Sequence, residues 1–125
     1  METTGQRHID LAWASGLIDG EGCFTFHKSV TIRVETTSRA CVEELFRIFG
    51  GSCAAVKRRT TGDRSVFSWA IYGKKAINVC VELSGLLKDK EIQAILLSRI
   101  HKYPPRSAMR ESLQSRLMKL KRTES

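Results

Sequence analysis

Two carboxylates, Asp19 and Glu21, lie two residues apart in a glycine-rich stretch. The apolar residues Ile9, Trp13 and Leu17 predict a helix that ends in this stretch. The C-terminus of a helix carries a partial negative charge, so acids there are unfavourable unless a cation offsets them. A bound Mg²⁺, which prefers carboxylate and carbonyl oxygens, would remove the repulsion. The alternative is that Asp19 binds a neighbouring backbone amide and Glu21 is solvated, and the residues alone leave the two interpretations even.

A line of small residues runs along the same helix, where Ala12, Gly16 and Gly20 recur at intervals of four. Glycine inside a helix costs about 1 kcal/mol relative to alanine, so this line needs a structural reason. Small side chains let another helix backbone approach closely, and packing against an identical helix is one such reason. Two such helices side by side would bring their terminal carboxylates together, which strengthens the case for a metal.

The remaining segments alternate between strand and helix patterns. Alternating apolar and polar residues predict strands, Ser38 starts a helix that stops at Gly50-Gly51, and Pro104-Pro105 ends a later helix. The expected elements are a helix over 9–17 that ends near Gly20, strands 23–28 and 31–35, a helix over 38–49, strands 53–57 and 65–72, and helices 74–87, 90–101 and 107–121. This order predicts an α+β fold in which helices cover one face of a four-stranded antiparallel sheet. We expect one domain over residues 1–102, with a basic C-terminal helix in residues 103–125 packed on it.

Strand alternation separates an apolar sheet face from a polar one. The residues expected to point inward are Phe24, Phe26, Ile32, Val34, Val56, Phe67, Trp69 and Ile71, together with Cys41, Val42, Leu45, Phe46 and Phe49 of the second helix. The residues expected on the open face are Thr25, His27, Arg33, Glu35, Lys57, Arg59, Arg64 and Ser68. Arginine can donate two hydrogen bonds to guanine and glutamate can accept one from cytosine, so this face suits base recognition. The plainer alternative is that any uncovered sheet face is polar, and the pattern alone favours that alternative.

The charge of the chain is unevenly distributed. Its 21 basic and 13 acidic residues give a net charge of +8, and residues 99–125 hold eight of the basic residues but two of the acidic ones. Such an excess indicates a polyanionic partner, either nucleic acid or an anionic membrane surface, and the alternative is a solvated basic tail. The stripe of Met109, Leu113, Leu117 and Leu120 predicts that the last helix packs on the domain with its basic side towards phosphate.

Several other kinds of chemistry find no support in the sequence. The four cysteines have no metal-ligand spacing, so we expect buried, reduced thiols. We find no nucleophile constellation, P-loop or dinucleotide fingerprint, and therefore expect no small-molecule substrate. No apolar run is long enough for a membrane span and the start lacks a signal pattern, so we expect an intracellular protein, cytoplasmic or associated with an organelle or nucleoid.

Residues 14–22, with the sequence ASGLIDGEG, resemble the signature nonapeptide of the LAGLIDADG homing endonuclease family. Ala14 stands in place of the first leucine, Ser15 in place of the following alanine, and Glu21 in place of the second aspartate. The order of helices and hairpins after this stretch is also that of the family, and the resemblance covers roughly residues 8–102.

The resemblance implies an αββαββα half-domain with a saddle-shaped sheet, and a site-specific endonuclease that cuts double-stranded DNA. One copy of the motif implies a homodimer acting on a long pseudo-palindromic site, with Mg²⁺, or Mn²⁺ in its place, as cofactor. The implied dimer interface is formed by Ala12, Trp13, Gly16 and Leu17 on the motif helix.

The resemblance also assigns roles at the site. It makes Glu21 the metal ligand with the carbonyl of Gly20 as a second ligand, and it groups Asp19 and Lys90 with Glu21 as catalytic residues, Lys88 being the alternative to Lys90. Thr36 or Arg39 would help to hold a water network, and Arg39 is also expected at the DNA. The main competing hypothesis is a related protein that binds nucleic acid without cutting it, as an RNA maturase or a repressor. A third is an inert basic interaction domain.

Overall fold

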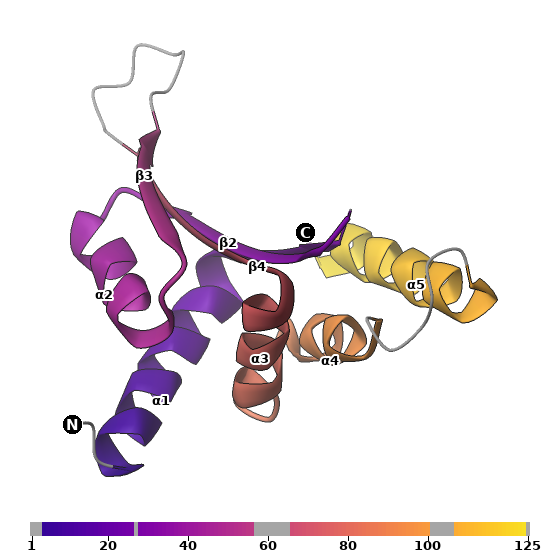
Figure 1. Cartoon of the computed structure of the whole chain (residues 1–125), viewed down its shortest axis with the longest axis horizontal. Coiled ribbons are helices and arrows are strands. Elements are labelled where there is room, and N and C mark those ends of the chain that lie inside the picture. The colour runs from indigo at the N-terminus through magenta and orange to yellow at the C-terminus, as the bar shows by residue number, and fades with distance from the viewer. Residues whose placement is uncertain (1–3, 27, 57–65, 101–106, 125) are drawn as a thin grey trace.

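The structure, a computed structural model, describes residues 4–26, 28–56, 66–100 and 107–124 of the 125-residue chain (Figure 1). The helices are α1 (Thr4–Glu21), α2 (Arg39–Phe49), α3 (Gly73–Leu83), α4 (Glu91–Ile100) and α5 (Ala108–Glu124), and the strands are β1 (Gly22–Phe26), β2 (Val30–Thr36), β3 (Ser52–Val56) and β4 (Val66–Tyr72). None of the helices in these ranges has the length and apolar character needed to cross a bilayer.

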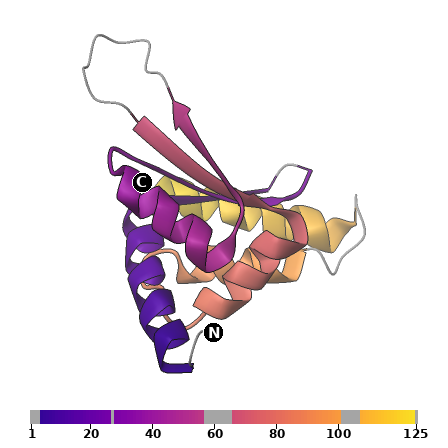
Figure 2. The same cartoon turned by 60° about the vertical axis from the view of Figure 1, so that its left-hand side comes forward.

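The four strands form one antiparallel sheet in the order β1-β2-β4-β3. Each of its two hairpins is contiguous in sequence, and the pairing of β2 with β4 joins them, so that Glu35 lies opposite Ser68 and Val34 opposite Trp69. Helices α1 to α4 lie below the curved sheet and leave its other face open (Figures 1 and 2). The predicted α+β fold with a four-stranded antiparallel sheet is therefore confirmed.

The core lies between the sheet and these helices. Phe24, Ile32 and Trp69 are completely buried, as their strand positions predict. The indole Nε1 of Trp69 donates a hydrogen bond to the carbonyl of Gly50 at 2.7 Å. The next residue, Gly51, has φ +91°, and a Cβ there would lie 2.5 Å from the carbonyl oxygen of Ala70. Glycine is thus required where the chain passes from α2 into β3 against β4.

Helix α2 shows a correct and an incorrect prediction. Ser38 caps it as expected, because its hydroxyl accepts a hydrogen bond from the amide of Cys41 at 3.3 Å. The buried face, however, is formed by Val42, Leu45 and Ile48, while Phe46 is 52% exposed. The prediction that Phe46 faces the core was therefore wrong, because a residue next to Leu45 lies about 100° further around the helix.

The prediction of four buried thiols was also wrong. Cys80 is buried, and desolvation raises its pKa to about 12. Cys23 and Cys53 are exposed and Cys41 is partly exposed. The reason at Cys23 is strand alternation: its neighbour Phe24 takes the core position, so Cys23 faces the open side of the sheet.

Some expected boundaries and burials differ from those observed. α1 begins at Thr4, before the expected start, and α3 ends at Leu83 rather than residue 87. A turn follows α3, in which Gly85 has φ +91° and the amide of Leu86 bonds to the carbonyl of Leu83 at 2.9 Å. Phe26 and Phe67 are half-buried, and the side chain of Val56 lies outside the described part.

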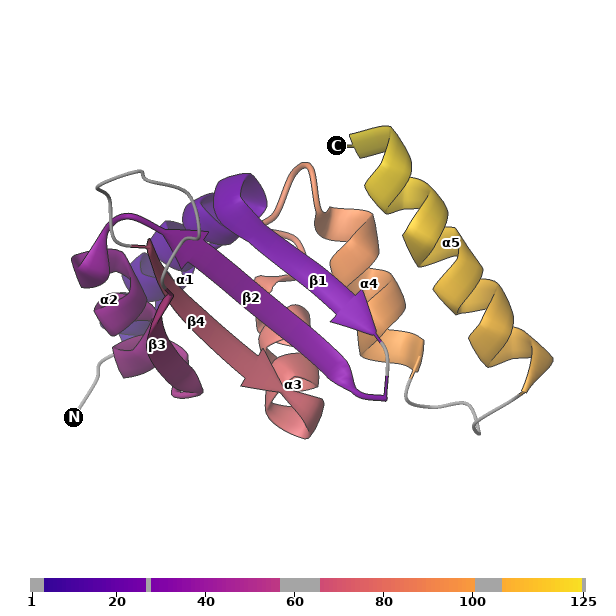
Figure 3. The same cartoon turned by 90° about the horizontal axis from the view of Figure 1, so that it is seen from above.

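Helix α5 packs beside α4 along the β1 edge of the sheet (Figure 3). Leu113 and Leu117 are buried, while Met109, at the start of the expected stripe, is 51% exposed. The side-chain amide of Gln114 donates to the carbonyl of Phe26 at 3.2 Å. The C-terminal helix is therefore attached to the edge strand by polar as well as apolar contacts.

Candidate functional site

The end of α1 passes directly into β1, and Gly22 makes this junction possible. A Cβ at residue 22 would lie 2.5 Å from the carbonyl oxygen of Ile18, so a larger residue would push the strand away from the helix. The side chain of Glu21, just before this junction, is exposed and has no hydrogen bond or ion pair to any described residue. The carbonyl of Gly20 is one of those at a helix end that lack an intrahelical partner.

The carboxylate of Asp19 is occupied by backbone amides just before α4. Its Oδ1 accepts from the amide of Lys90 at 2.9 Å and its Oδ2 from the amide of Asp89 at 3.1 Å. Burial raises the pKa of Asp19, but the amides of Lys90, Asp89 and Lys88 outweigh it, so this pKa lies below its ordinary value. Asp19 therefore joins the end of α1 to the start of α4, which is the capping alternative considered from sequence. Its catalytic role remains a prediction.

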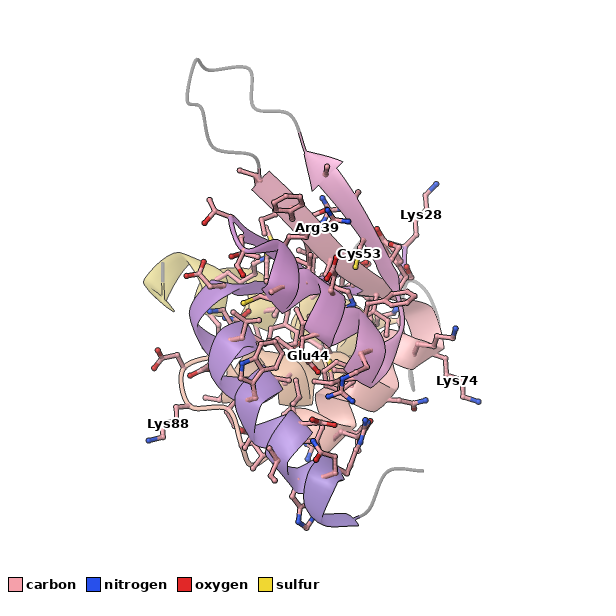
Figure 4. The ribbon with its side chains drawn as sticks, turned by 90° about the vertical axis from the view of Figure 1, so that its left-hand side faces the viewer. Lys28, Arg39, Glu44, Cys53, Lys74 and Lys88 are labelled. Atoms are coloured by element: carbon pink, nitrogen blue, oxygen red, sulfur yellow. The ribbon has the colours of Figure 1, made fainter. Side chains whose placement is uncertain are left out.

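Lys90 is attached to the same residue by its side chain. Its Nζ donates to the backbone carbonyl of Asp19 at 2.5 Å, so both ends of Lys90 contact Asp19. Lys88, the alternative candidate, is exposed and points away from the ribbon (Figure 4). Geometry thus places the side chain of Lys90, and not that of Lys88, beside the end of α1.

These groups surround a small open pocket. Its volume is about 330 Å³, and its lining residues are Asp19, Gly20, Gly22, Cys23, Asp89, Lys90, Gln93 and Lys121. Gln93 is 2% exposed, and Lys121 comes from α5. Glu21 adjoins two lining glycines in sequence, although its own side chain does not line the pocket. The sequence did not assign Cys23, Gln93 or Lys121 to this site, although it did predict that the basic side of the last helix, which includes Lys121, faces phosphate.

The open sheet face contains part of the predicted base-contacting set. The guanidinium of Arg33 lies 4.0 Å from the carboxylate of Glu35, and both side chains are about half exposed. Thr25 and Ser68 are half-buried on the same face. The predicted residues that lie outside the described part are His27, Lys57, Arg59 and Arg64.

The two candidates for a water network have other partners. Arg39 lies in the first turn of α2 rather than on the sheet, exposed, and its Nε donates to Glu43 at 2.9 Å. The hydroxyl of Thr36 accepts from the amide of Ser38 at 3.2 Å, just before the same helix. Neither residue lines the pocket. Their assistance at the site stays a prediction.

The outer face of α1 is apolar and uncovered. Ile9 is 64% and Trp13 39% exposed, and Ala12 and Gly16 are exposed beside them. A Cβ added at Gly16 would meet nothing within 4 Å, so the fold of a single chain does not require glycine there. Leu17 is half-buried and packs against the core, so it belongs only partly to this face.

The donor set at the end of α1 can be compared with what a divalent metal needs. Among the described residues no group of three or more His, Cys, Asp or Glu side chains could hold a metal ion. One chain provides the carboxylate of Glu21 and the carbonyl of Gly20, since the carboxylate of Asp19 is already bound. Mg²⁺ is commonly held by one or two carboxylates, with water and substrate phosphates completing its octahedron. The residues therefore fit part of a Mg²⁺ site.

The fold defines the class of protein to which this chain is structurally similar, the homing endonucleases. One structure of I-CvuI, with the I-CreI target and Mg, matches at 21% identity and TM-score 0.70, over 91% of this chain and 83% of the other. A second structure of I-CvuI, with its own target and Ca, matches at 20% identity and TM-score 0.73, over 94% of this chain and 85% of the other. The archaeal intron-encoded I-Vdi141I in complex with DNA also matches, at 14% identity and TM-score 0.67, over 90% of this chain and 84% of the other. No family model and no curated protein matches the sequence. The resemblance to the LAGLIDADG homing endonucleases is thereby confirmed at the level of the fold.

Proposed function

We propose that this chain is a homing endonuclease that cuts both strands of DNA as a homodimer with Mg²⁺, on a long pseudo-palindromic site inside the cell. The observation that carries the proposal is the corner formed by α1, β1 and α4. There Glu21 has no described partner, while Asp19 and Lys90 are bound to each other beside it. The DNA complexes of the structurally similar endonucleases support DNA as the substrate.

Dimerisation through α1 follows from the exposed face of that helix. Trp13 and Ile9 present apolar surface to solvent, and Ala12 and Gly16 leave room for a second helix backbone. Among the described residues, one chain supplies Glu21 beside the pocket and Asp89 in its lining as carboxylates without a hydrogen bond or ion pair. A second copy, packed with its α1 against the first, would bring a second Glu21 close by and complete the metal-binding set.

The residues at the end of α1 and the start of α4 would have different roles at the scissile phosphate. Glu21 and the carbonyl of Gly20 would hold Mg²⁺, which when bound supplies Lewis-acid polarisation and an activated water. Asp19 holds the start of α4, and so Lys90, in a fixed place. An ammonium group has three donors, so the bond of Lys90 to Asp19 leaves two for a phosphate oxygen. Lys90 would thus stabilise the negative charge that develops as the phosphodiester is attacked.

The open face of the sheet would lie in the major groove. Arg33 and Glu35 are exposed there and carry a donor fork and an acceptor, respectively. Arg33 would donate to guanine and Glu35 would accept from cytosine, each released from its partner across 4.0 Å. Thr25 and Ser68 would add shorter polar contacts from β1 and β4.

A cleavage selection tests the proposal. Purified protein is incubated with a randomised duplex library in Mg²⁺ or in EDTA, and the ends produced are sequenced. We expect ends that appear only with Mg²⁺ and converge on one near-palindromic sequence. Glu21→Gln should abolish cutting and keep binding near the wild-type level, because it removes a charge without changing the size of the side chain. Bound but uncut DNA in both tubes would contradict the nuclease and favour a repressor, and no DNA enrichment would point to RNA.

Sedimentation tests the dimer separately. The chain of 14.1 kDa should sediment near twice that mass. Gly16→Leu should give a folded monomer, because a side chain at residue 16 meets nothing within the single chain but would block a second helix. A wild-type monomer both with and without DNA would contradict the proposed interface.

A further inference from the structure

The last turns of α5 reach the pocket at the end of α1. α5 runs back along β1, so that its C-terminal end lies towards the start of β1 and the start of α4 (Figure 3). Lys121, in this end of α5, lines the same pocket as Asp19, Gly20 and Lys90. A residue from a helix that follows the main domain in sequence is therefore part of the candidate site.

The backbone of Lys121 is fixed by contacts of the helix that carries it. Leu117, one turn earlier on the same side of α5, is 2% exposed, and Leu113 is 8% exposed. The guanidinium of Arg110 lies over the ring of Phe26, at 4.7 Å from its centroid. Lys121 is half-buried, in contrast to the exposed Arg116 on the same helix. Lys121 therefore lies on a helix that is packed against the domain, and its position is set by that packing.

The charges around the pocket leave Lys121 available. Asp19 is bound to backbone amides, and Lys90 donates to the carbonyl of Asp19. Asp89 also lines the pocket, but no ion pair or hydrogen bond joins it to Lys121, and Lys121 has no such contact with any other described residue. The carboxylates of Asp19 and Asp89 line the pocket beside Lys90 and Lys121, so the two lysines do not repel each other unopposed, but neither carboxylate occupies the ammonium group of Lys121. The half-buried ammonium of Lys121 is thus free to donate charge-assisted hydrogen bonds to a phosphate oxygen at this edge of the open sheet face.

We propose that Lys121 binds a phosphodiester phosphate of the DNA strand that enters this pocket, next to the bond served by Glu21 and Lys90. The proposal rests on the proposed function for the identity of the strand. α5 thus forms one wall of the phosphate-binding pocket, and the basic C-terminal segment has a defined task at the site in addition to its general attraction for DNA.

The first test needs no cleavage. Lysines of the wild-type protein are acetylated with and without a random-sequence duplex at low salt, and the modified positions are read by mass spectrometry. Lys121 should be protected by the duplex, while Lys74, exposed on α3 and pointing away from the molecule, should react equally in both samples (Figure 4). Equal reactivity of Lys121 with and without the duplex would overturn the proposal.

The second test compares Lys121→Gln with Arg116→Gln, which removes the same charge from the exposed side of the same helix. On the duplex recovered from the selection, Lys121→Gln should slow single-turnover cleavage about 10- to 100-fold at saturating protein, because the strand loses a contact that positions the neighbouring scissile bond. It should also lower the salt slope of binding by about 1. Arg116→Gln should leave the cleavage rate unchanged, and Lys121→Arg should restore part of it. Equal rates for the two glutamine variants would overturn the proposal.

The two tests separate this proposal from the proposed function. Protection of Lys121 in a protein that cuts no duplex would contradict the nuclease and support the phosphate site. Cleavage that depends on Glu21 while Lys121 stays unprotected would support the nuclease and contradict the phosphate site. Melting temperatures of the variants, followed by circular dichroism, identify any loss of activity that comes from unfolding.

Discussion

Two aspartates lie in opposite halves of α1, and their hydrogen bonds differ in kind. Asp10 is 4% exposed, and its Oδ1 alone takes both donors, Gln6 at 2.9 Å and Arg47 at 2.8 Å, while its buried Oδ2 has no partner in the described part. Asp19 uses both oxygens, one for each of two backbone amides. The first aspartate therefore depends on side-chain donors, and the second on the backbone just before another helix.

The two parts of α1 therefore have different roles: one contacts other helices and the other forms the pocket. In the N-terminal half, Asp10 joins α1 to Arg47 of α2, and Nη2 of Arg7 donates to both carboxylate oxygens of Glu82 of α3, at 2.7 and 2.8 Å. These pairs hold helices together and lie away from the pocket. At the C-terminal end, Asp19 holds the backbone that carries Lys90. Backbone hydrogen bonds define a position more sharply than surface ion pairs, as the pocket end of the helix requires.

Of the changes at the two aspartates, Asp19→Ala is expected to have the largest effect. It removes the acceptor of two amides before α4, which we expect to lower stability by about 1 kcal/mol, as for the loss of a helix cap. Because Lys90 loses its fixed position, cleavage of the selected duplex should fall by about 100-fold or more. Asp19→Asn keeps one acceptor oxygen, so its cleavage rate should lie between those of the wild type and Asp19→Ala. Cleavage by Asp19→Ala at the wild-type rate, measured with folded protein, would show that Asp19 does not position the site.

Asp10→Ala should have a smaller effect, and only on stability. The melting temperature should fall because Arg47 loses a partner, although Arg47 is about half exposed and keeps its contact with Glu44. Asp10→Asn should lower it less, since an amide oxygen still accepts from Arg47. The cleavage rate should stay the same for both variants. A cleavage defect equal to that of Asp19→Ala would remove the proposed difference between the two ends of α1.

The smallest expected effect is a change in the free energy of unfolding when the pH is lowered. The hydrogen bond from Arg47, against the opposing effect of burial, lowers the pKa of Asp10, and the pKa of Asp19 is also lowered. A lowered pKa in the folded state adds stability at pH values above the ordinary value of 3.8, and this stability is lost as the pH falls through the folded value. Urea unfolding should therefore show a stability that declines below about pH 4. Asp10→Asn and Asp19→Asn should each flatten the decline. Glu21→Gln, which removes a carboxylate without a described partner, is the matched control. Identical dependence of stability on pH in Asp10→Asn, Asp19→Asn and Glu21→Gln would contradict the expectation.

Local patterns in the sequence predicted most of the fold. Strand alternation placed Phe24, Ile32 and Trp69 in the core, and Ser38 marked the start of α2, because these signals depend only on neighbours along the chain. The errors arose where several local solutions were equally good. Phe46 is as apolar as Leu45, and the packing of α2 against the sheet selected Val42, Leu45 and Ile48 as the buried face.

The candidate site divides in the same way. The sequence by itself determined that α1 ends in two acids among glycines, and that the chain follows with two hairpins, since both features are local. Only the tertiary structure decided which acid is left without a partner, because the amides that bind Asp19 belong to residues about 70 positions later in the chain. The same packing brings Lys121 from the last helix into the pocket. Contacts across such distances depend on how whole elements pack, and no local spacing encodes them.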